Sequence, residues 1–189
     1  GYAIVVGSWL VACVVGTIPY LIWGGEFTIV NAWFESVSGF TTTGASILND
    51  IEFLPRGMLF WRSATHWMGG IGVVMFALVI LPSIGKTKMT ISSVEISNLA
   101  KDNYQYRSNV IMHILLWVYV AMTLVCTVLL KICGMNWFDA VNHAFSAVAT
   151  GGFSTKNLSV GAFNNPVIEI VLAVAMALFG INFSCYYLL

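Results

Sequence analysis

Residues 38–46 read Ser-Gly-Phe-Thr-Thr-Thr-Gly-Ala-Ser, a run of small and polar residues inside a chain that is otherwise strongly apolar. Threonine, serine and glycine are weaker helix formers than alanine or leucine, so the run predicts a break in helical structure. Non-helical backbone at membrane depth occurs only where protein or a water-filled cavity surrounds it, because lipid cannot hydrogen-bond its N–H and C=O groups. What this stretch does therefore depends on whether the chain lies in a membrane.

The composition of the 189 residues is typical of a membrane protein. Hydrophobic residues make up 59% of the chain and charged residues only 8%, whereas roughly a quarter of the residues in soluble domains are charged. The formal net charge is zero, so the sequence predicts no nucleic-acid partner. We expect an all-α integral membrane protein that contacts lipid and crosses the membrane several times.

Four segments are long and apolar enough to cross a bilayer core, which takes about 20 helical residues for about 30 Å. They are residues 2–23, 57–82, 109–133 and 165–189. The chain begins with Gly1 rather than Met and ends inside the fourth apolar segment. We therefore expect it to be an internal piece of a longer protein.

Two shorter apolar segments lie between these spans, and each runs into a loop of threonine and glycine. A helix predicted at about residues 30–41 leads into a loop at about 41–46, and a helix at about 138–149 leads into a loop at about 149–154. Three helical turns are too short to cross the bilayer. We expect each segment to be a re-entrant helix followed by a buried loop.

The two loops align without gaps under one constant shift of the numbering. The aligned pairs are Ser38 with Ser146, Thr42 with Thr150, Gly44 with Gly152, and Ser46 with Ser154. We call this constant shift the repeat offset. The order span, short helix, loop, span also recurs, which indicates an internal repeat. The sequence predicts a first repeat at residues 1–82, a second at 109–189, and a linker at 83–108.

The linker contains half of the eight basic residues of the chain. These are Lys86, Lys88, Lys101 and Arg107. Short loops rich in lysine and arginine stay in the cytoplasm, so we expect a cytoplasmic linker and two loops that enter from the outer side.

A span, a short helix, a glycine-containing loop and a second span is the arrangement with which channels present backbone carbonyl oxygens to a dehydrated cation. Glycine allows consecutive carbonyls to face one way at φ/ψ angles that a Cβ would forbid. The C-terminal end of a short helix carries partial negative charge, which favours a nearby cation. The pattern therefore predicts an ion-selective pore.

Three motifs, at residues 34–45, 60–72 and 143–155, resemble those of the Trk/Ktr/HKT superfamily of potassium transport proteins, closest to the bacterial TrkH type. They read Phe-Glu-Ser-Val-Ser-Gly-Phe-Thr-Thr-Thr-Gly-Ala, Phe-Trp-Arg-Ser through Trp-Met-Gly-Gly-Ile-Gly, and His-Ala-Phe-Ser-Ala-Val-Ala-Thr-Gly-Gly-Phe-Ser-Thr. The motifs fall in the family's order, with matching spans along essentially the whole chain.

This resemblance implies potassium uptake through a selectivity filter built from four repeats of one polypeptide, of which this chain holds two. The implied filter residues are Thr41, Thr42, Thr43, Gly44, Ala149, Thr150, Gly151 and Gly152. Potassium, as the substrate, would be bound by the main-chain carbonyls of Thr42, Thr43, Gly44, Thr150, Gly151 and Gly152. In the plant branch of the superfamily, serine in the first loop accompanies sodium preference, so glycine at 44 favours potassium.

The resemblance also implies partners outside this chain. They are the remaining two repeats of the same polypeptide, a second copy in a homodimer, and a cytosolic nucleotide-binding regulatory subunit. No cofactor and no enzymatic activity are expected from these residues.

Two other classes of protein remain open from the residues alone. A secondary transporter with paired re-entrant segments would carry sodium or couple transport to another ion, but such proteins often contain inverted repeats, whereas an even number of spans makes these repeats parallel. A structural membrane subunit without a pore is the third class. Bulky residues tolerated at Gly44 and Gly152 would favour it.

Charged residues within membrane segments are functional candidates, because burying a charge there is costly. Arg62 and Glu169 are of this kind, and we expect them to reach the interface or to support a loop. Whether they pair with each other or with Glu35 stays open from sequence alone.

The remaining polar and small residues have no ligand-like spacing and favour packing. We expect hydrogen-bonding or packing roles for His66, His113, His143, Cys13, Cys126, Cys133 and Cys185, and close helix packing at Gly69, Gly70, Gly72 and Gly180.

Overall fold

The computed structural model describes residues 2–89 and 98–180, and the described chain is helical with no strand. The elements are α1 (Tyr2–Trp23), α2 (Ile29–Phe40), α3 (Arg56–Met89), α4 (Asn98–Ile132), α5 (Trp137–Val148), the 3-10 helix η1 (Ser159–Phe163) and α6 (Pro166–Gly180). Because the described residues form helices and no strand, the predicted all-α class is confirmed.

Two helices among the described residues are long and apolar enough to cross a membrane by length and composition. They are Val5–Trp23 in α1, with mean hydropathy 2.0, and Met112–Ile132 in α4, with mean hydropathy 2.2. The apolar α6 is shorter within the described range, and residues 181–189 of the span predicted at 165–189 lie outside it. Exposed apolar side chains such as Val11 and Trp117 cover the outer faces of α1 and α4, as lipid contact requires.

The long helices extend further than the apolar segments from which they were predicted. The helix α3 continues to Met89 and α4 begins at Asn98, so both enter the predicted linker at 83–108. Hydropathy marks the part of a helix that lies in lipid, whereas a helix in water continues through lysine and other polar residues. Residues 90–97 of this linker lie outside the described residues.

The short helices α2 and α5 begin with the same kind of cap. The Thr28 side chain accepts a hydrogen bond from the Asn31 amide, and the Asn136 side chain accepts one from the Asp139 amide. Such caps satisfy N–H groups that have no partner within the helix. The repeat offset that aligns the two loops also takes Thr28 to Asn136.

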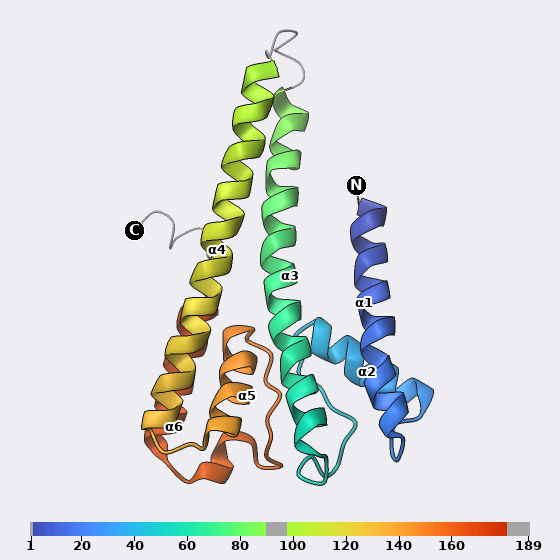
Figure 1. The fold of residues 1–189 in the computed structure, drawn as a ribbon, viewed down its shortest axis with the longest axis vertical. Helices are drawn as coiled ribbons and strands as arrows, with labels where there is room; N and C mark the ends of the chain where they lie inside the picture. The colour runs from blue at the N-terminus through green and yellow to red at the C-terminus, as the bar shows by residue number, and fades with distance from the viewer. Residues whose placement is uncertain (1, 90–97, 181–189) are drawn as a thin grey trace.

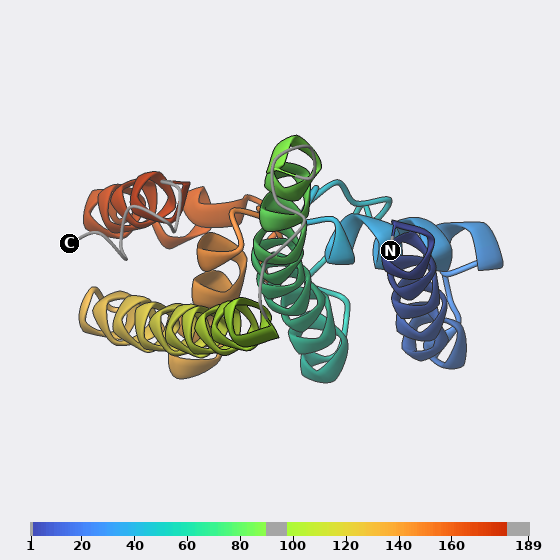
Figure 2. The same ribbon diagram turned by 90° about the horizontal axis from the view of Figure 1, so that it is seen from above.

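The helix α3 occupies the centre of the molecule (Figures 1 and 2). It packs against α2 and α1 on one side and against α5 and α4 on the other. Each repeat has its own hydrophobic cluster: one includes Tyr20, Ala32 and Leu54, and the other includes Leu130 and Ala144. The central α3 therefore supports both short helices.

Candidate functional site: two loops at the ends of the short helices

The two loops share an unusual backbone conformation. Thr42 and Thr150, which follow the last turns of α2 and α5, have φ values of 54° and 52°. Gly44 and Gly152, two residues later, have φ values of 74° and 97°. A β-branched residue with positive φ is rare and strained, and such strain gathers at functional sites. Its occurrence at both equivalent positions shows that the repeat is one of backbone geometry as well as of sequence.

Main-chain hydrogen bonds end the two short helices in the same way. In each case two successive amides bond back to carbonyls of the last helical turn, which satisfies groups left open at the helix end. The bonds are Thr42 N to Gly39 O (3.0 Å), Thr43 N to Ser38 O (3.0 Å), Thr150 N to Ala147 O (2.9 Å) and Gly151 N to Ser146 O (2.8 Å).

The first loop (residues 41–46) lies against the second (residues 149–154). A Cβ atom added at Gly44 would collide with the main-chain oxygen of Gly151, and one added at Gly151 would collide with the His66 ring. At Gly152 a Cβ would meet no atom within 4 Å, although its φ disfavours any other residue. The structure therefore brings the predicted residues of both loops together at one place.

Exposure differs among the eight predicted filter residues. Ala149 and Gly151 are buried, Thr42 and Gly44 are partly buried, and Thr41, Thr43, Thr150 and Gly152 are exposed in this chain.

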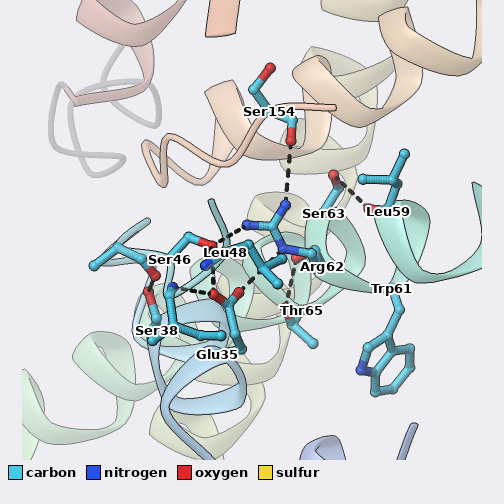
Figure 3. A network of polar contacts seen from close by, with 12 residues as sticks. Glu35, Ser38, Ser46, Leu48, Leu59, Trp61, Arg62, Ser63, Thr65 and Ser154 are labelled. Carbon is cyan, nitrogen blue, oxygen red and sulfur yellow. Dashed lines mark hydrogen bonds and ion pairs between the residues drawn. The ribbon is translucent and has the colours of Figure 1, made fainter. Parts of the chain in front are cut away.

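A buried ion pair supports the first loop (Figure 3). Arg62 Nε on α3 lies 3.2 Å from Glu35 Oε2 on α2, and the two side chains are 1% and 0% exposed. The other carboxylate oxygen of Glu35 accepts hydrogen bonds from the Ser46 hydroxyl (2.5 Å) and the Ile47 amide (2.8 Å). Burial of two charges is tolerated only with such complete hydrogen bonding. The pairing that the sequence left open is thus Arg62 with Glu35, while Glu169 is exposed on α6.

The Arg62 guanidinium also reaches the second loop. Its Nη2 donates to Ser46 Oγ at 3.0 Å, and its Nη1 donates to the main-chain oxygen of Ser154 at 3.5 Å. Its Cζ lies 4.2 Å from the centroid of the Phe153 ring, which is within the range of a cation–π interaction. We refer to Arg62, Glu35, Ser46, Phe153 and Ser154 as the Arg62 network.

His143 supports the second loop. His143 Nδ1 lies 2.8 Å from the main-chain oxygen of Asp139, and His143 Nε2 lies 2.9 Å from the Ser154 hydroxyl. A carbonyl only accepts, so Nδ1 is the donor, and Nε2 of the neutral ring accepts from Ser154. Thr155 in turn donates its hydroxyl to the Asp139 carboxylate at 2.6 Å.

His66, which follows Arg62 by one helical turn, connects α3 to the second loop. Its ring is fully buried and stacks on Phe153 with centroids 4.0 Å apart. Its Nδ1 lies 3.2 Å from the Ser146 hydroxyl, which also accepts a hydrogen bond from the Gly152 amide at 2.9 Å. The histidines His66 and His143 therefore have the hydrogen-bonding roles that the sequence favoured.

Polar contacts also join the segments that follow the two loops. Asn157 accepts from the Ile51 amide at 2.6 Å and donates to Asp50 at 2.8 Å, and Lys156 Nζ lies 3.2 Å from Glu52 Oε2. These contacts are exposed, so each one stabilises the structure only weakly.

The close packing expected at glycines of α3 is present. A Cβ at Gly69 would collide with the Phe40 main chain, and one at Gly70 would lie 2.5 Å from the Tyr119 hydroxyl. Cys13, Cys126 and Cys133 are free, and the described part of the chain has no cluster of three or more acidic, histidine or cysteine residues able to hold a metal.

Sequence reasoning identified the loops and named Arg62 as a candidate to support one of them, but it did not identify the contacts that Arg62 and His66 make across the fold. Arg62 and Ser154 are 92 residues apart, and His66 and Ser146 are 80 residues apart. Besides the charge of Arg62, a signal in the sequence was the repeat offset, which aligns Glu35 with His143 as well as Ser46 with Ser154.

Comparison with known proteins agrees with this architecture. The family model of TrkH, described as a cation transport protein, matches residues 1–189. The Trk system potassium uptake protein TrkH of Salmonella typhimurium is 38% identical over 189 residues, which cover 99% of this chain and 39% of that protein. The Trk system potassium uptake protein TrkG of Escherichia coli is 35% identical, over 100% of this chain and 39% of its own length.

A solved structure of a related protein has a similar fold. The crystal structure of the potassium transporter TrkH from Vibrio parahaemolyticus aligns with a TM-score of 0.77 and 33% identity, over 93% of this chain and 34% of that one. The chain thus spans about 39% of the length of the curated relatives that it matches. Because the family model matches the whole sequence, the chain belongs to the TrkH family of cation transport proteins.

Proposed function

We propose that this chain supplies two of the four loops of a potassium-selective filter, in a protein that takes up potassium across the inner (plasma) membrane. The observation that carries the proposal is the duplicated loop geometry, with positive φ at Thr42 and Gly44 and again at Thr150 and Gly152. Glycine permits the backbone angles at which consecutive carbonyls face one way, and channels build their filters from rings of such carbonyls. The names of the relatives, which are potassium uptake proteins, support the choice of ion.

In this proposal a potassium ion sheds water and is bound by main-chain oxygens. The carbonyls would come from Thr42, Thr43, Gly44, Thr150, Gly151 and Gly152, with equivalent groups from the other two repeats of the polypeptide. The C-terminal ends of α2 and α5 lie directly before the two loops. Their partial negative charge favours a cation at this position.

The partners in this proposal follow from the family resemblance. The full-length protein would form a homodimer and bind a cytosolic nucleotide-binding regulatory subunit. The segment 83–108, with its four basic residues, is the proposed cytoplasmic side of the pore.

The test replaces the loop glycines in the full-length protein. Gly44→Ser and Gly152→Ser should lower the permeability ratio of potassium to sodium, because serine strains the positive-φ backbone that orients the carbonyls. Gly57→Ser is the matched control, since Gly57 lies at the start of α3 with no atom within 4 Å of an added Cβ. An unchanged ratio in both loop variants, measured by ion flux in proteoliposomes, would contradict the proposal.

The same flux assay separates a channel from a secondary transporter. Passive uptake stops when potassium reaches electrochemical equilibrium, whereas coupled uptake continues against the gradient when a second ion is supplied. We also expect the 189-residue chain alone to conduct no potassium, because two loops leave the ion half hydrated. Potassium-selective flux from the chain alone, without two copies assembling into four loops, would count against the filter.

A further inference from the structure

One side chain of the first repeat touches both loops. The Arg62 guanidinium contacts Glu35 and Ser46 on one side and the main-chain oxygen of Ser154 on the other (Figure 3). It is 1% exposed and lies over the Phe153 ring of the second loop. A cation buried this completely is expensive to place in a membrane protein unless each of its donors has a partner.

The second repeat has no cation of its own at this position. The repeat offset aligns Arg62 with Ile170 and Glu35 with His143. The cation that contacts Ser154 of the second loop therefore comes from α3, in the first repeat. One guanidinium serves two loops that are related by the repeat.

Arginine suits this position for a chemical reason. Its planar guanidinium holds five N–H donors in fixed directions, so it can bond a carboxylate, a hydroxyl and a carbonyl at the same time. Lysine would keep the charge, but its single ammonium on a flexible chain cannot reach groups on opposite sides with the same geometry.

We propose that Arg62 is a positioning residue for ion selectivity, which holds the first loop, through Glu35 and Ser46, at a set distance from the second loop at Ser154. This inference rests on the proposed function and adds to it. Selectivity depends on the number and placement of the coordinating carbonyls, and Arg62 connects the two loops that carry them through the Ser46 hydroxyl and the Ser154 main-chain oxygen. Loosening this connection changes the spacing between loops while each loop keeps its own helix-end hydrogen bonds.

The experiment compares Arg62→Lys with wild type in the full-length protein. We expect the potassium-to-sodium permeability ratio to fall about tenfold, which corresponds to about 1.4 kcal/mol of lost discrimination. The amount of protein in the membrane should change little, because lysine preserves the charge opposite Glu35. Arg56→Lys is the matched control: Arg56 is an exposed arginine on the same helix, and its ratio should equal that of wild type.

Ser46→Ala is the second variant, for the case in which Arg62→Lys does not accumulate. It removes the hydroxyl that bonds Arg62 Nη2 and Glu35, and it leaves no charge unpaired. We expect a smaller fall in the ratio, about threefold, because the hydrogen bonds of one hydroxyl are lost while the ion pair remains. A wild-type ratio in whichever variant is present in the membrane overturns the positioning role.

Failure of this inference is distinguishable from failure of the proposed function. If Gly44→Ser lowers the ratio and neither Arg62→Lys nor Ser46→Ala does, the filter stands and the positioning role is wrong. If wild-type protein itself fails to prefer potassium over sodium, the proposed function fails, and the positioning role fails with it.

Discussion

The first and second loops reach one backbone conformation with different supports. Thr42 and Thr150 have nearly the same φ, 54° and 52°. In the first loop, Ser46 lies two residues after Gly44 and donates its hydroxyl to Glu35, a carboxylate paired with Arg62. In the second loop, the equivalent residue Ser154 donates its hydroxyl to the His143 ring.

The two repeats therefore share main-chain geometry more strictly than side-chain chemistry. A carboxylate and an imidazole can each accept a serine hydroxyl, so either can fix the loop. The costs differ, because the carboxylate needs a buried cation beside it whereas the neutral ring does not. Loss of Glu35 therefore leaves the buried Arg62 charge unpaired, whereas loss of the His143 ring removes no charge.

The greatest loss of stability should come from replacing Glu35 or His143, the residues that support the two loops. Glu35→Gln should lower the free energy of unfolding by about 3–5 kcal/mol, because it leaves Arg62 charged, buried and unpaired. His143→Gln should cost only about 1–3 kcal/mol, for lost hydrogen bonds in a neutral site. Thermal unfolding of the full-length variants in detergent measures the difference. Equal losses would show that the Arg62 charge does not depend on the Glu35 carboxylate.

Replacing Gly44 and replacing Gly152 should lower the free energy of unfolding by amounts that differ less than those for the two supports. Gly152→Ala should cost about 1–2 kcal/mol, for a Cβ in the left-handed region alone. Gly44→Ala adds a collision with the Gly151 main chain, so we expect a larger loss of stability and of potassium selectivity. Unfolding and flux assays on the two variants, run in parallel, give the ranking. A Gly152 variant as damaged as the Gly44 variant would mean that the contact between loops is unimportant.

The first loop also contains a pair of hydroxyls that the second loop lacks. This pair should contribute less to the free energy of unfolding than the loop glycines do. The Thr41 and Thr43 hydroxyls lie 2.8 Å apart, and the residues at these positions in the second loop are Ala149 and Gly151. Thr43→Val keeps the side-chain shape and removes one hydroxyl, which should cost about 0.5–1.5 kcal/mol. Thermal unfolding reports the loss. No loss in this variant would show that the hydroxyl pair is replaced by water at no cost.

The contacts between the segments beyond the loops should matter least. Lys156→Ala removes a salt bridge to Glu52 whose side chains are 34% and 45% exposed. Exposed pairs contribute about 0–1 kcal/mol and weaken with salt. Unfolding at low and high ionic strength should therefore differ little between variant and wild type. A loss that persists in high salt would assign this contact a larger role than its exposure suggests.

The fold class and both loops could be predicted from the sequence because those features have local signals. Apolar segments mark the spans, and threonine and glycine mark the loops between them. The repeat offset predicted which positions correspond, such as Ser46 and Ser154. The assignment of eight filter residues remains a prediction that the flux experiments test.

The supports of the loops could not be predicted because they depend on contacts across the fold. Arg62 was a candidate from its charge alone, but its contact with Ser154 joins residues 92 positions apart. Such a contact depends on how α3 packs between α2 and α5, which periodicity in one helix does not report. The extension of α3 and α4 into the predicted linker was missed for a related reason, since hydropathy measures contact with lipid and not helix length.

The contact between Arg62 and Ser154 has a consequence for biogenesis. At about 5–20 residues per second, the ribosome adds Ser154 on the order of 5–20 s after Arg62, since 92 residues separate them. During that interval Arg62 can pair with Glu35, but its Nη1 lacks its acceptor, the main-chain oxygen of Ser154. The first loop therefore reaches its final surroundings only after the second has been translated and inserted, so the two repeats mature together rather than one after the other.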